Sequence, residues 1–125
     1  MANLAPTQRL RLPGQFKRVF ARPVRAGNHQ LTVLARPNGL AHARLGLAVP
    51  KRHLRRAVDR NRFKRIVRES FRLNQAGLAG LDIVVLARHG SVDFDARNLR
   101  AGIDRQWDFI RRRSPHQSGI VDTHG

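Results

Sequence analysis

The 125-residue sequence contains no cysteine. That absence excludes disulfide bonds, thiolate zinc sites and a cysteine nucleophile. Acidic residues are also scarce, since eight Asp and Glu stand against 25 Lys and Arg and leave a formal net charge of +17. No apolar run approaches the roughly 18 residues of a membrane span, and the N-terminus lacks the apolar segment of a signal peptide. We therefore expect a cytoplasmic protein that is neither membrane-spanning nor secreted.

Residues that could carry catalysis are sparse as well. The six histidines, at positions 29, 42, 53, 89, 116 and 124, show no HxxxH or similar metal-ligand spacing. The carboxylates are scattered, and their one close pair, Asp93 and Asp95, stands where a helix cap is expected. Two-metal cleavage of a phosphodiester needs several converging carboxylates, and we find neither a Gly-rich phosphate loop nor a serine nucleophile motif. We predict no catalytic residue and no metal site in this chain.

Basic residues are what the sequence has in excess. A net charge of +17 is typical of a protein that binds nucleic acid or an anionic membrane. Arginine outnumbers lysine by 22 to 3. Because the guanidinium group makes bidentate contacts with phosphate and stacks on bases, this ratio favours RNA. A biased genome composition would produce the same ratio, so the ratio alone does not decide the matter.

The stretch from Lys51 to Arg72 concentrates this charge. It holds ten basic residues and two acidic ones, which gives it a net charge of +8. From Asp59 onward the spacing predicts a helix with two different faces. One face carries a polar line flanked by Arg62 and Lys64, and the other is apolar apart from Ser70. The line consists of Asn61, Arg65, Arg68 and Arg72, and the apolar side of Phe63, Ile66, Val67 and Phe71.

A run of charge is most often a solvated helix face. Here, however, Glu69 is the one glutamate in the sequence, so i,i+4 ion pairs cannot neutralise the basic line. Like charges on one helix face repel and destabilise the helix unless a polyanion binds there. We interpret the face as a binding surface. Leu54, Ala57 and Val58 are out of phase with it, which indicates a loop before the helix or an entry turn that packs differently.

Hydrophobic patterns predict the other elements. Met1 to Arg11 is expected to be a polar, loose leader, followed by a helix that begins near Pro13 and ends before Pro23. Strands are expected at Leu31–Arg36 and Arg44–Val49, joined by a turn at 37–39, and a short extra strand would fit near 25–29. A loop over 74–80 leads to a third strand, 81–88, which is apolar on both faces after its second residue and is therefore central.

The last predicted element is a helix that ends at about residue 113. Ser91, Asp93 or Asp95 can cap its start, and three arginines at 111–113 suit its C-terminal dipole. Its core stripe comprises Leu99, Ile103, Gln106, Trp107 and Ile110. Residues 114–125 are expected to be a disordered tail. The sequence thus predicts a single α+β domain over residues 1–113, with the order α-β-β-α-β-α.

The first helix carries an aromatic stripe. Phe16, Val19 and Phe20 share one face, with two cations beside them. Such a stripe is most often part of a core. Phenyl rings next to cations also suit single-stranded RNA, because stacking is independent of base sequence. On the second long strand, Gly46 and Ala48 face away from the core side and leave room either for another packed element or for a nucleic-acid backbone.

Taken together, these motifs resemble those of the bacterial ribonuclease P protein family. The family signature of Arg-Asn-Arg, then Lys-Arg, then Arg-Glu is matched at residues 60–62, 64–65 and 68–69. FKRVF at 16–20, RLGLAVPKR at 44–52, LDIVVLAR at 81–88 and the final helix match in the same order. The family is the protein part of a ribozyme that removes 5′ leaders from precursor tRNAs. The resemblance therefore implies an RNA-binding subunit of an endoribonuclease holoenzyme.

The resemblance also implies a fold, partners and site residues. The fold would be a sandwich like a ribosomal-protein domain, with a left-handed βαβ crossover that contains the basic helix. The RNA would be the catalyst and would use Mg²⁺, while the protein would bind it one to one and also contact precursor tRNA. The family's aromatic on the first long strand is replaced here by Leu34. Implied contacts with the catalytic RNA are Lys51, Arg52, Arg60, Asn61, Arg62, Lys64, Arg65, Arg68 and Arg72. A leader cleft between the first helix and the sheet would be lined by Phe16, Lys17, Arg18, Phe20, Arg36 and Arg44.

A basic structural ribosomal protein is the main alternative, since it would be equally small and equally charged. The Arg-Asn-Arg helix together with the upstream FKRVF favours ribonuclease P. A DNA-binding helix-turn-helix protein would need a second short helix just before the basic one, where the sequence instead has a strand and Pro50. An autonomous nuclease is disfavoured by the scattered carboxylates.

Overall fold

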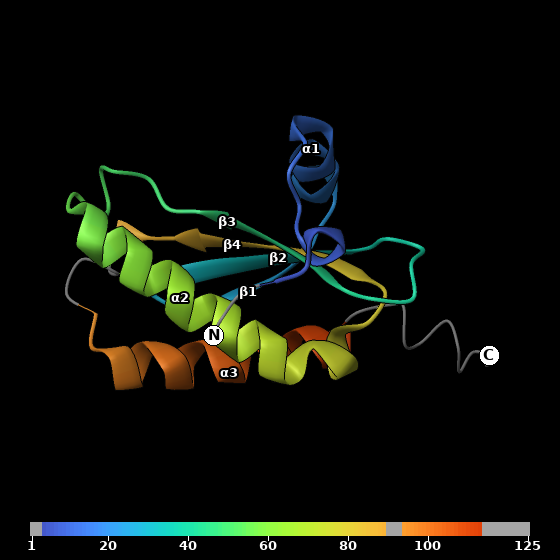
Figure 1. Cartoon of the computed structure of the whole chain (residues 1–125). Helices are drawn as coiled ribbons and strands as arrows, with labels where there is room; N and C mark the ends of the chain where they lie inside the picture. Colours follow the sequence, from blue (N-terminus) through green and yellow to red (C-terminus); the bar gives the residue numbers. More distant parts are fainter. Residues whose placement is uncertain (1–3, 90–93, 114–125) are drawn as a thin grey trace.

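A four-stranded sheet with helices on both faces makes up the computed structural model, which describes residues 4–89 and 94–113 (Figure 1). In Figure 1, α1 stands on one side of the sheet, and α2 and α3 cover the other. The α-helices are α1 (Pro13–Ala21), α2 (Ala57–Asn74) and α3 (Ala96–Arg113), and the 3₁₀ helices are η1 (Pro6–Gln8) and η2 (Gln75–Leu78). The strands are β1 (Val24–Gly27), β2 (Leu31–Pro37), β3 (Arg44–Ala48) and β4 (Leu81–Ala87).

The sheet is mixed, with the strand order β1-β2-β4-β3. β2 pairs antiparallel with β1 and β4, whereas β3 runs parallel to β4. β4 is therefore central and covered on both faces, which confirms the prediction from its two apolar faces. β3 and β4 are joined through α2 as a βαβ unit, and the left-handed crossing implied by the resemblance stays a prediction. β3 forms one edge of the sheet.

The larger core lies between the sheet and the α2–α3 pair. Alternation along β2 is as predicted, because Leu31, Val33 and Ala35 are fully buried on this face while Leu34 points to the other. The predicted apolar faces of α2 and α3 supply its helical part, and β4 contributes Leu81, Ile83 and Val85. Its fully buried helical residues are Phe63, Val67, Phe71, Leu99, Ile103, Trp107 and Ile110.

A polar residue in the middle of this core has a specific partner. Ser70 lies on the apolar face of α2, and its hydroxyl accepts a hydrogen bond from Trp107 Nε1 at 2.7 Å while donating to Asp104. Burial of an indole N–H without a partner is costly, so Ser70 completes the packing between α2 and α3.

The smaller core lies under α1. Val19 is fully buried against Leu34 and Val84, with Leu10 beside them. Pro13 occupies the first turn of the helix, as predicted, and the side-chain carbonyl of Gln15 accepts hydrogen bonds from the backbone N–H groups of residues 11 and 12, at 2.7 and 3.0 Å. In Figure 1, α1 projects from the sheet rather than lying along it.

Two sequence-based expectations were wrong. The leader is not loose from residue 4 onward: Leu4 and Leu10 are buried, η1 lies between them, and Leu10 N–H donates to the Leu45 carbonyl at 3.0 Å. These two leucines are isolated among polar residues, so the sequence pattern gave no sign of their burial. The predicted loop at 74–80 contains the last residue of α2 and then η2, whose Leu78 is buried.

Other expectations are confirmed or fall outside the described residues. A short strand, β1, exists near the predicted position. Asp95 caps α3, since its carboxylate accepts from the Arg97 N–H at 3.0 Å. Ser91, Asp93 and the tail at 114–125 lie outside the described residues. No helix in the described part of the chain is long and apolar enough to cross a membrane.

Candidate nucleic-acid interface

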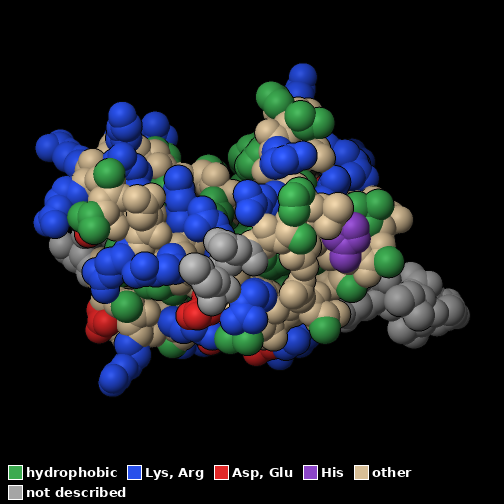
Figure 2. All heavy atoms as spheres, viewed as in Figure 1, with side chains coloured by type: hydrophobic (Ala, Val, Ile, Leu, Met, Phe, Trp, Pro, Cys, Tyr) green, Lys and Arg blue, Asp and Glu red, His purple; other side chains and the backbone are tan. Residues whose placement is uncertain are grey.

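The basic face of α2 has no compensating acidic partner among the described residues. Asn61 and Arg65 are exposed, while Arg68 and Arg72 are half-buried. Glu69, the one acid that could neutralise this face, instead pairs with Arg100 of α3 at 3.3 Å. Within residues 4–89 and 94–113, the cations of this line form no ion pair. Figure 2 shows Lys and Arg side chains gathered over α2, with acidic side chains mainly toward α3.

Two of the predicted contact residues on α2 also have structural partners. Arg60 Nη1 donates to the backbone carbonyls of Leu54 and Arg55, at 2.9 and 2.7 Å, and so holds the loop that precedes the helix. The Arg62 guanidinium lies over the Phe94 ring, 5.1 Å from its centroid. Of the three residues out of phase, Leu54 lies in this loop, whereas Ala57 and Val58 form the start of α2 and are exposed. Lys51 and Arg52 are exposed in the same loop.

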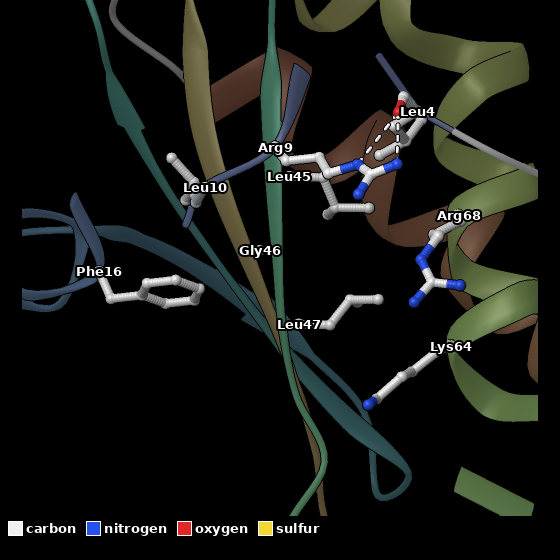
Figure 3. Close-up of a pocket in the computed structure, with 9 residues that line it drawn as sticks. All are labelled: Leu4, Arg9, Leu10, Phe16, Leu45, Gly46, Leu47, Lys64 and Arg68. Atoms are coloured by element: carbon white, nitrogen blue, oxygen red, sulfur yellow. Dashed lines mark hydrogen bonds between the residues drawn. The ribbon is translucent and has the colours of Figure 1, made fainter. Parts of the chain in front are cut away.

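A hollow of about 360 Å³ lies along the free edge of β3 (Figure 3). We call it the β3-edge hollow. Phe16 of α1 stands on one side of the strand, and Lys64 and Arg68 of α2 stand on the other. Leu4, Arg9, Leu10, Leu45, Gly46 and Leu47 complete its lining. Figure 2 shows the corresponding depression between α1 and the rest of the surface.

Gly46 allows Phe16 to reach the strand. A Cβ atom at this position would lie 2.6 Å from Phe16 Cε1 and 3.1 Å from Leu10 Cβ. Those separations are shorter than van der Waals contact, so a side chain at residue 46 would displace the ring. The sequence left open whether Gly46 makes room for another packed element or for a nucleic-acid backbone. In the structure, the packed element α1 occupies this part of the strand.

The cations of the β3-edge hollow face each other without a carboxylate among the lining residues. Burial lowers the pKa of Arg68, and the nearby charge of Arg9 lowers it further. Arg9 is oriented by the Leu4 carbonyl, which accepts hydrogen bonds from its Nε and Nη2 at 3.0 and 2.8 Å. A phosphate in the hollow would relieve this repulsion. Sequence reasoning missed Arg9 because it stood in the stretch expected to be loose.

Three of the predicted cleft arginines bind other parts of the protein. Asp82 is buried, and Arg44 donates to its two carboxylate oxygens from Nε and Nη2, at 2.8 and 2.7 Å. Asn38 donates to the same carboxylate at 2.9 Å, and Arg18 Nη1 lies 3.9 Å from it. The hydrogen bond from Arg44 to Asp82 raises the pKa of Arg44. Arg36 Nη1 donates to the Arg18 carbonyl at 3.0 Å.

These contacts, which we call the Asp82 network, tie α1 to the sheet. Arg18 extends them by donating to the Pro37 carbonyl at 3.1 Å. Sequence reasoning missed Asp82 as their centre. A lone acid in an apolar strand was the available signal, but the partner could be identified only once β3 was paired with β4, which sets residues 44 and 82 opposite each other.

The aromatic stripe of α1 divides into three environments. Val19 is the core residue, Phe16 is half-buried at the β3-edge hollow, and Phe20 is 46% exposed. Lys17 is exposed. Leu34, at the position of the family's strand aromatic, is buried under α1. The space directly between α1 and the sheet is therefore filled, and the open hollow lies beside it.

No group of three or more His, Asp or Glu residues among those described stands close enough to hold a metal ion. The described carboxylates instead pair with arginines, cap α3 or bind Ser70. A basic α+β domain with an uncompensated arginine face, and with an aromatic ring across a strand edge from it, is a nucleic-acid-binding protein by its geometry and charge.

Comparison with known proteins narrows this class. The sequence model of the family described as Ribonuclease P matches residues 4–111. The ribonuclease P protein component of Pasteurella multocida is 50% identical over 105 residues, covering 84% of this chain and 88% of that protein. The Yersinia pestis protein of the same name is 46% identical over 117 residues, covering 92% and 98%. The chain therefore belongs to the ribonuclease P protein family.

Solved structures agree. The Staphylococcus aureus RNase P protein superimposes with a TM-score of 0.76 at 27% identity, covering 82% of this chain and 94% of that one. The Thermotoga maritima RNase P protein, in complex with 1-(4-fluorophenyl)-2-thiourea, gives 0.72 at 34% identity, with 78% and 95% covered. The chain is thus an RNA-binding subunit of ribonuclease P, an endoribonuclease whose RNA is catalytic, and the ribosomal alternative is not favoured.

Proposed function

We propose that the chain binds the catalytic RNA through α2 and holds the 5′ leader of precursor tRNA in the β3-edge hollow. One protein binds one catalytic RNA in the cytoplasm, and the RNA carries the Mg²⁺ ions that promote cleavage. The protein contributes affinity and orientation for the leader, so that the RNA cuts at the tRNA 5′ end.

The observation that carries this proposal is the composition of the β3-edge hollow. The half-buried ring of Phe16 stands on one side of β3 and two cations stand on the other (Figure 3). Single-stranded RNA suits such a site, because its bases stack on aromatic rings and its phosphates bind cations. A duplex would offer no unstacked base to Phe16, so the hollow favours a single strand such as a leader.

The basic face of α2 supports the other half of the proposal. Its line of cations has no acidic partner among the described residues, and it continues from the hollow along the exposed side of the helix. Sequence-independent phosphate contacts of this kind supply much of the affinity for a folded RNA. Lys64 and Arg68 belong to both surfaces, so we expect them to lie where the catalytic RNA and the leader meet.

The test compares precursor and mature tRNA with a Phe16→Ala holoenzyme. Loss of one stacked base costs about 1–3 kcal/mol, which is roughly a 5- to 140-fold loss of affinity for the precursor. Affinity for mature tRNA, which lacks the leader, should stay near that of the wild type. Phe109→Ala is the matched control, since this ring is 43% exposed on α3 and stacks with Arg113. Equal losses for both tRNAs would rule out the leader in this hollow.

A further inference from the structure

A second hollow, of about 400 Å³, lies at the start of α2 and contains a pair of histidines. His53 belongs to the loop between β3 and α2, and His89 follows β4. Their Nδ1 atoms are 3.3 Å apart, and the rings meet edge to face with centroids 5.4 Å apart. We call this site the histidine hollow. It is separate from the β3-edge hollow and shares no lining residue with it.

The histidine hollow is strongly basic. Arg52, Arg55 and Arg56 line it, and its one lining carboxylate, Asp59, is 3.6 Å from Arg56. With neutral histidines the lining residues carry three positive charges and one negative charge. Leu54 is buried at the base of this loop, and Arg60 holds the loop by donating to the Leu54 carbonyl. The hollow therefore belongs to a fixed loop rather than to a chance approach of side chains.

We infer that the histidine hollow binds a phosphate group of the catalytic RNA and that the His53–His89 pair takes up a proton when it does. This inference rests on the proposed function, because it assumes that α2 binds this RNA. It goes beyond that function in assigning a separate phosphate site and in making RNA affinity depend on pH.

The geometry of the pair leads to proton uptake. At 3.3 Å the two facing Nδ1 atoms are within hydrogen-bond distance, and such a bond needs a hydrogen on only one of them. A second proton would bring two cations into contact beside three arginines. Burial lowers the pKa of His53, and the charges of Arg52 and His89 lower it further. A phosphate accepts hydrogen bonds from both protonated rings and offsets their charge. Bound phosphate therefore favours the state in which both histidines are protonated, which is unfavourable in the free protein.

The remaining charged groups near the two histidines do not offset the charge of the protonated rings as a phosphate would. Asp59 is directed to Arg56, and the Arg88 side chain, next to His89, donates to the Asn28 carbonyl at 2.9 Å. Two histidine nitrogens about 3.3 Å apart could also bind Zn²⁺, whose bonds to nitrogen are about 2.0–2.1 Å long. Three lining arginines oppose a cation and favour an anion, which decides for phosphate.

The experiment measures the dissociation constant of the catalytic RNA from pH 8.0 to 5.5 at constant ionic strength. Wild type is compared with the His53→Gln/His89→Gln double variant and with His42→Gln, a control whose ring contacts the Thr7 carbonyl instead. Where the complex holds one more proton than the separate protein and RNA, each fall of one pH unit tightens binding by up to about tenfold. The ratio of the double-variant constant to the wild-type constant should therefore rise about tenfold between pH 7.5 and 5.5. The ratio for His42→Gln should stay constant.

The outcomes separate this inference from the proposed function. If wild type does not bind the RNA at pH 8.0, the proposed function fails. If it binds but the double variant has the same pH dependence, the histidine hollow is not a phosphate site. Loss of RNA binding on adding EDTA in wild type but not in the double variant, with Mg²⁺ held in excess, would indicate a bound transition metal and overturn the inference. Should the double variant not fold, His89→Gln alone, at an exposed position, provides the same comparison.

Discussion

The two faces of the sheet hold their helices by different means. On the face toward α2 and α3, large apolar side chains form a continuous core in which Trp107, Phe63 and Phe71 are fully buried. On the α1 face, a few aliphatic side chains are assisted by the Asp82 network. Because only a small apolar cluster lies under α1, directional bonds help to position the helix that carries Phe16.

The largest expected difference between the faces concerns two phenylalanines. Phe71→Ala removes a fully buried ring from the larger core and should lower the free energy of unfolding by about 3–5 kcal/mol. Phe20→Ala removes a ring that is 46% exposed on α1 and should lower it by less than about 1 kcal/mol. Equilibrium unfolding in urea measures both. Comparable losses would mean that α1 is held by a core after all.

The next effect concerns the Asp82 network. Asp82→Asn leaves Arg44 without its carboxylate and should cost about 2–3 kcal/mol of stability, somewhat less than for a fully buried pair because the Arg44 side chain keeps 20% exposure. Asp59→Asn is the matched control, since it breaks the exposed pair with Arg56 and should cost at most about 1 kcal/mol. The same urea titration applies. Equal costs for the two variants would show that the network does not anchor α1.

The smallest effect on stability, but not on binding, is expected on the basic face of α2. Arg65→Ala should change the free energy of unfolding by no more than about 0.5 kcal/mol. It should also reduce the slope of log affinity against log salt by about 1 for catalytic RNA. Arg65→Lys should restore the slope but not all of the affinity, because the planar fork is lost. Arg105→Ala, at an exposed position on α3, is the control. An unchanged slope for Arg65→Ala would mean that this residue is merely solvated.

Periodicity predicted the elements whose apolar residues dominate their pattern. The two faces of α2, the alternation in β2 and the central place of β4 followed directly from residue spacing. Packing that depends on a few side chains could not be predicted in this way. Leu4 and Leu10 are isolated in a polar stretch, and their burial depends on the edge of β3, which a one-dimensional pattern does not contain.

The roles of individual polar residues were also beyond the sequence pattern. Ser70 interrupts an apolar face because Trp107, 37 residues away, needs an acceptor. Arg60 lies in the family signature, yet its guanidinium binds the loop before α2. The family resemblance implied that Arg36 and Arg44 line the leader cleft, and whether they touch RNA stays a prediction, but their hydrogen bonds to Arg18 and Asp82 are structural. Such partners become visible only when distant segments are brought together.

The free edge of β3 has a consequence for the solubility of the protein before it meets RNA. An unpaired strand edge can pair with the edge of another molecule and start aggregation. Here the backbone of residue 9 bridges to Leu45, and the rest of the edge is flanked by Lys64 and Arg68. Two copies brought edge to edge would place these cations against each other within a pair of molecules that each carry a net charge of +17. The same charge that is typical of a protein that binds a polyanion thus keeps identical strands apart.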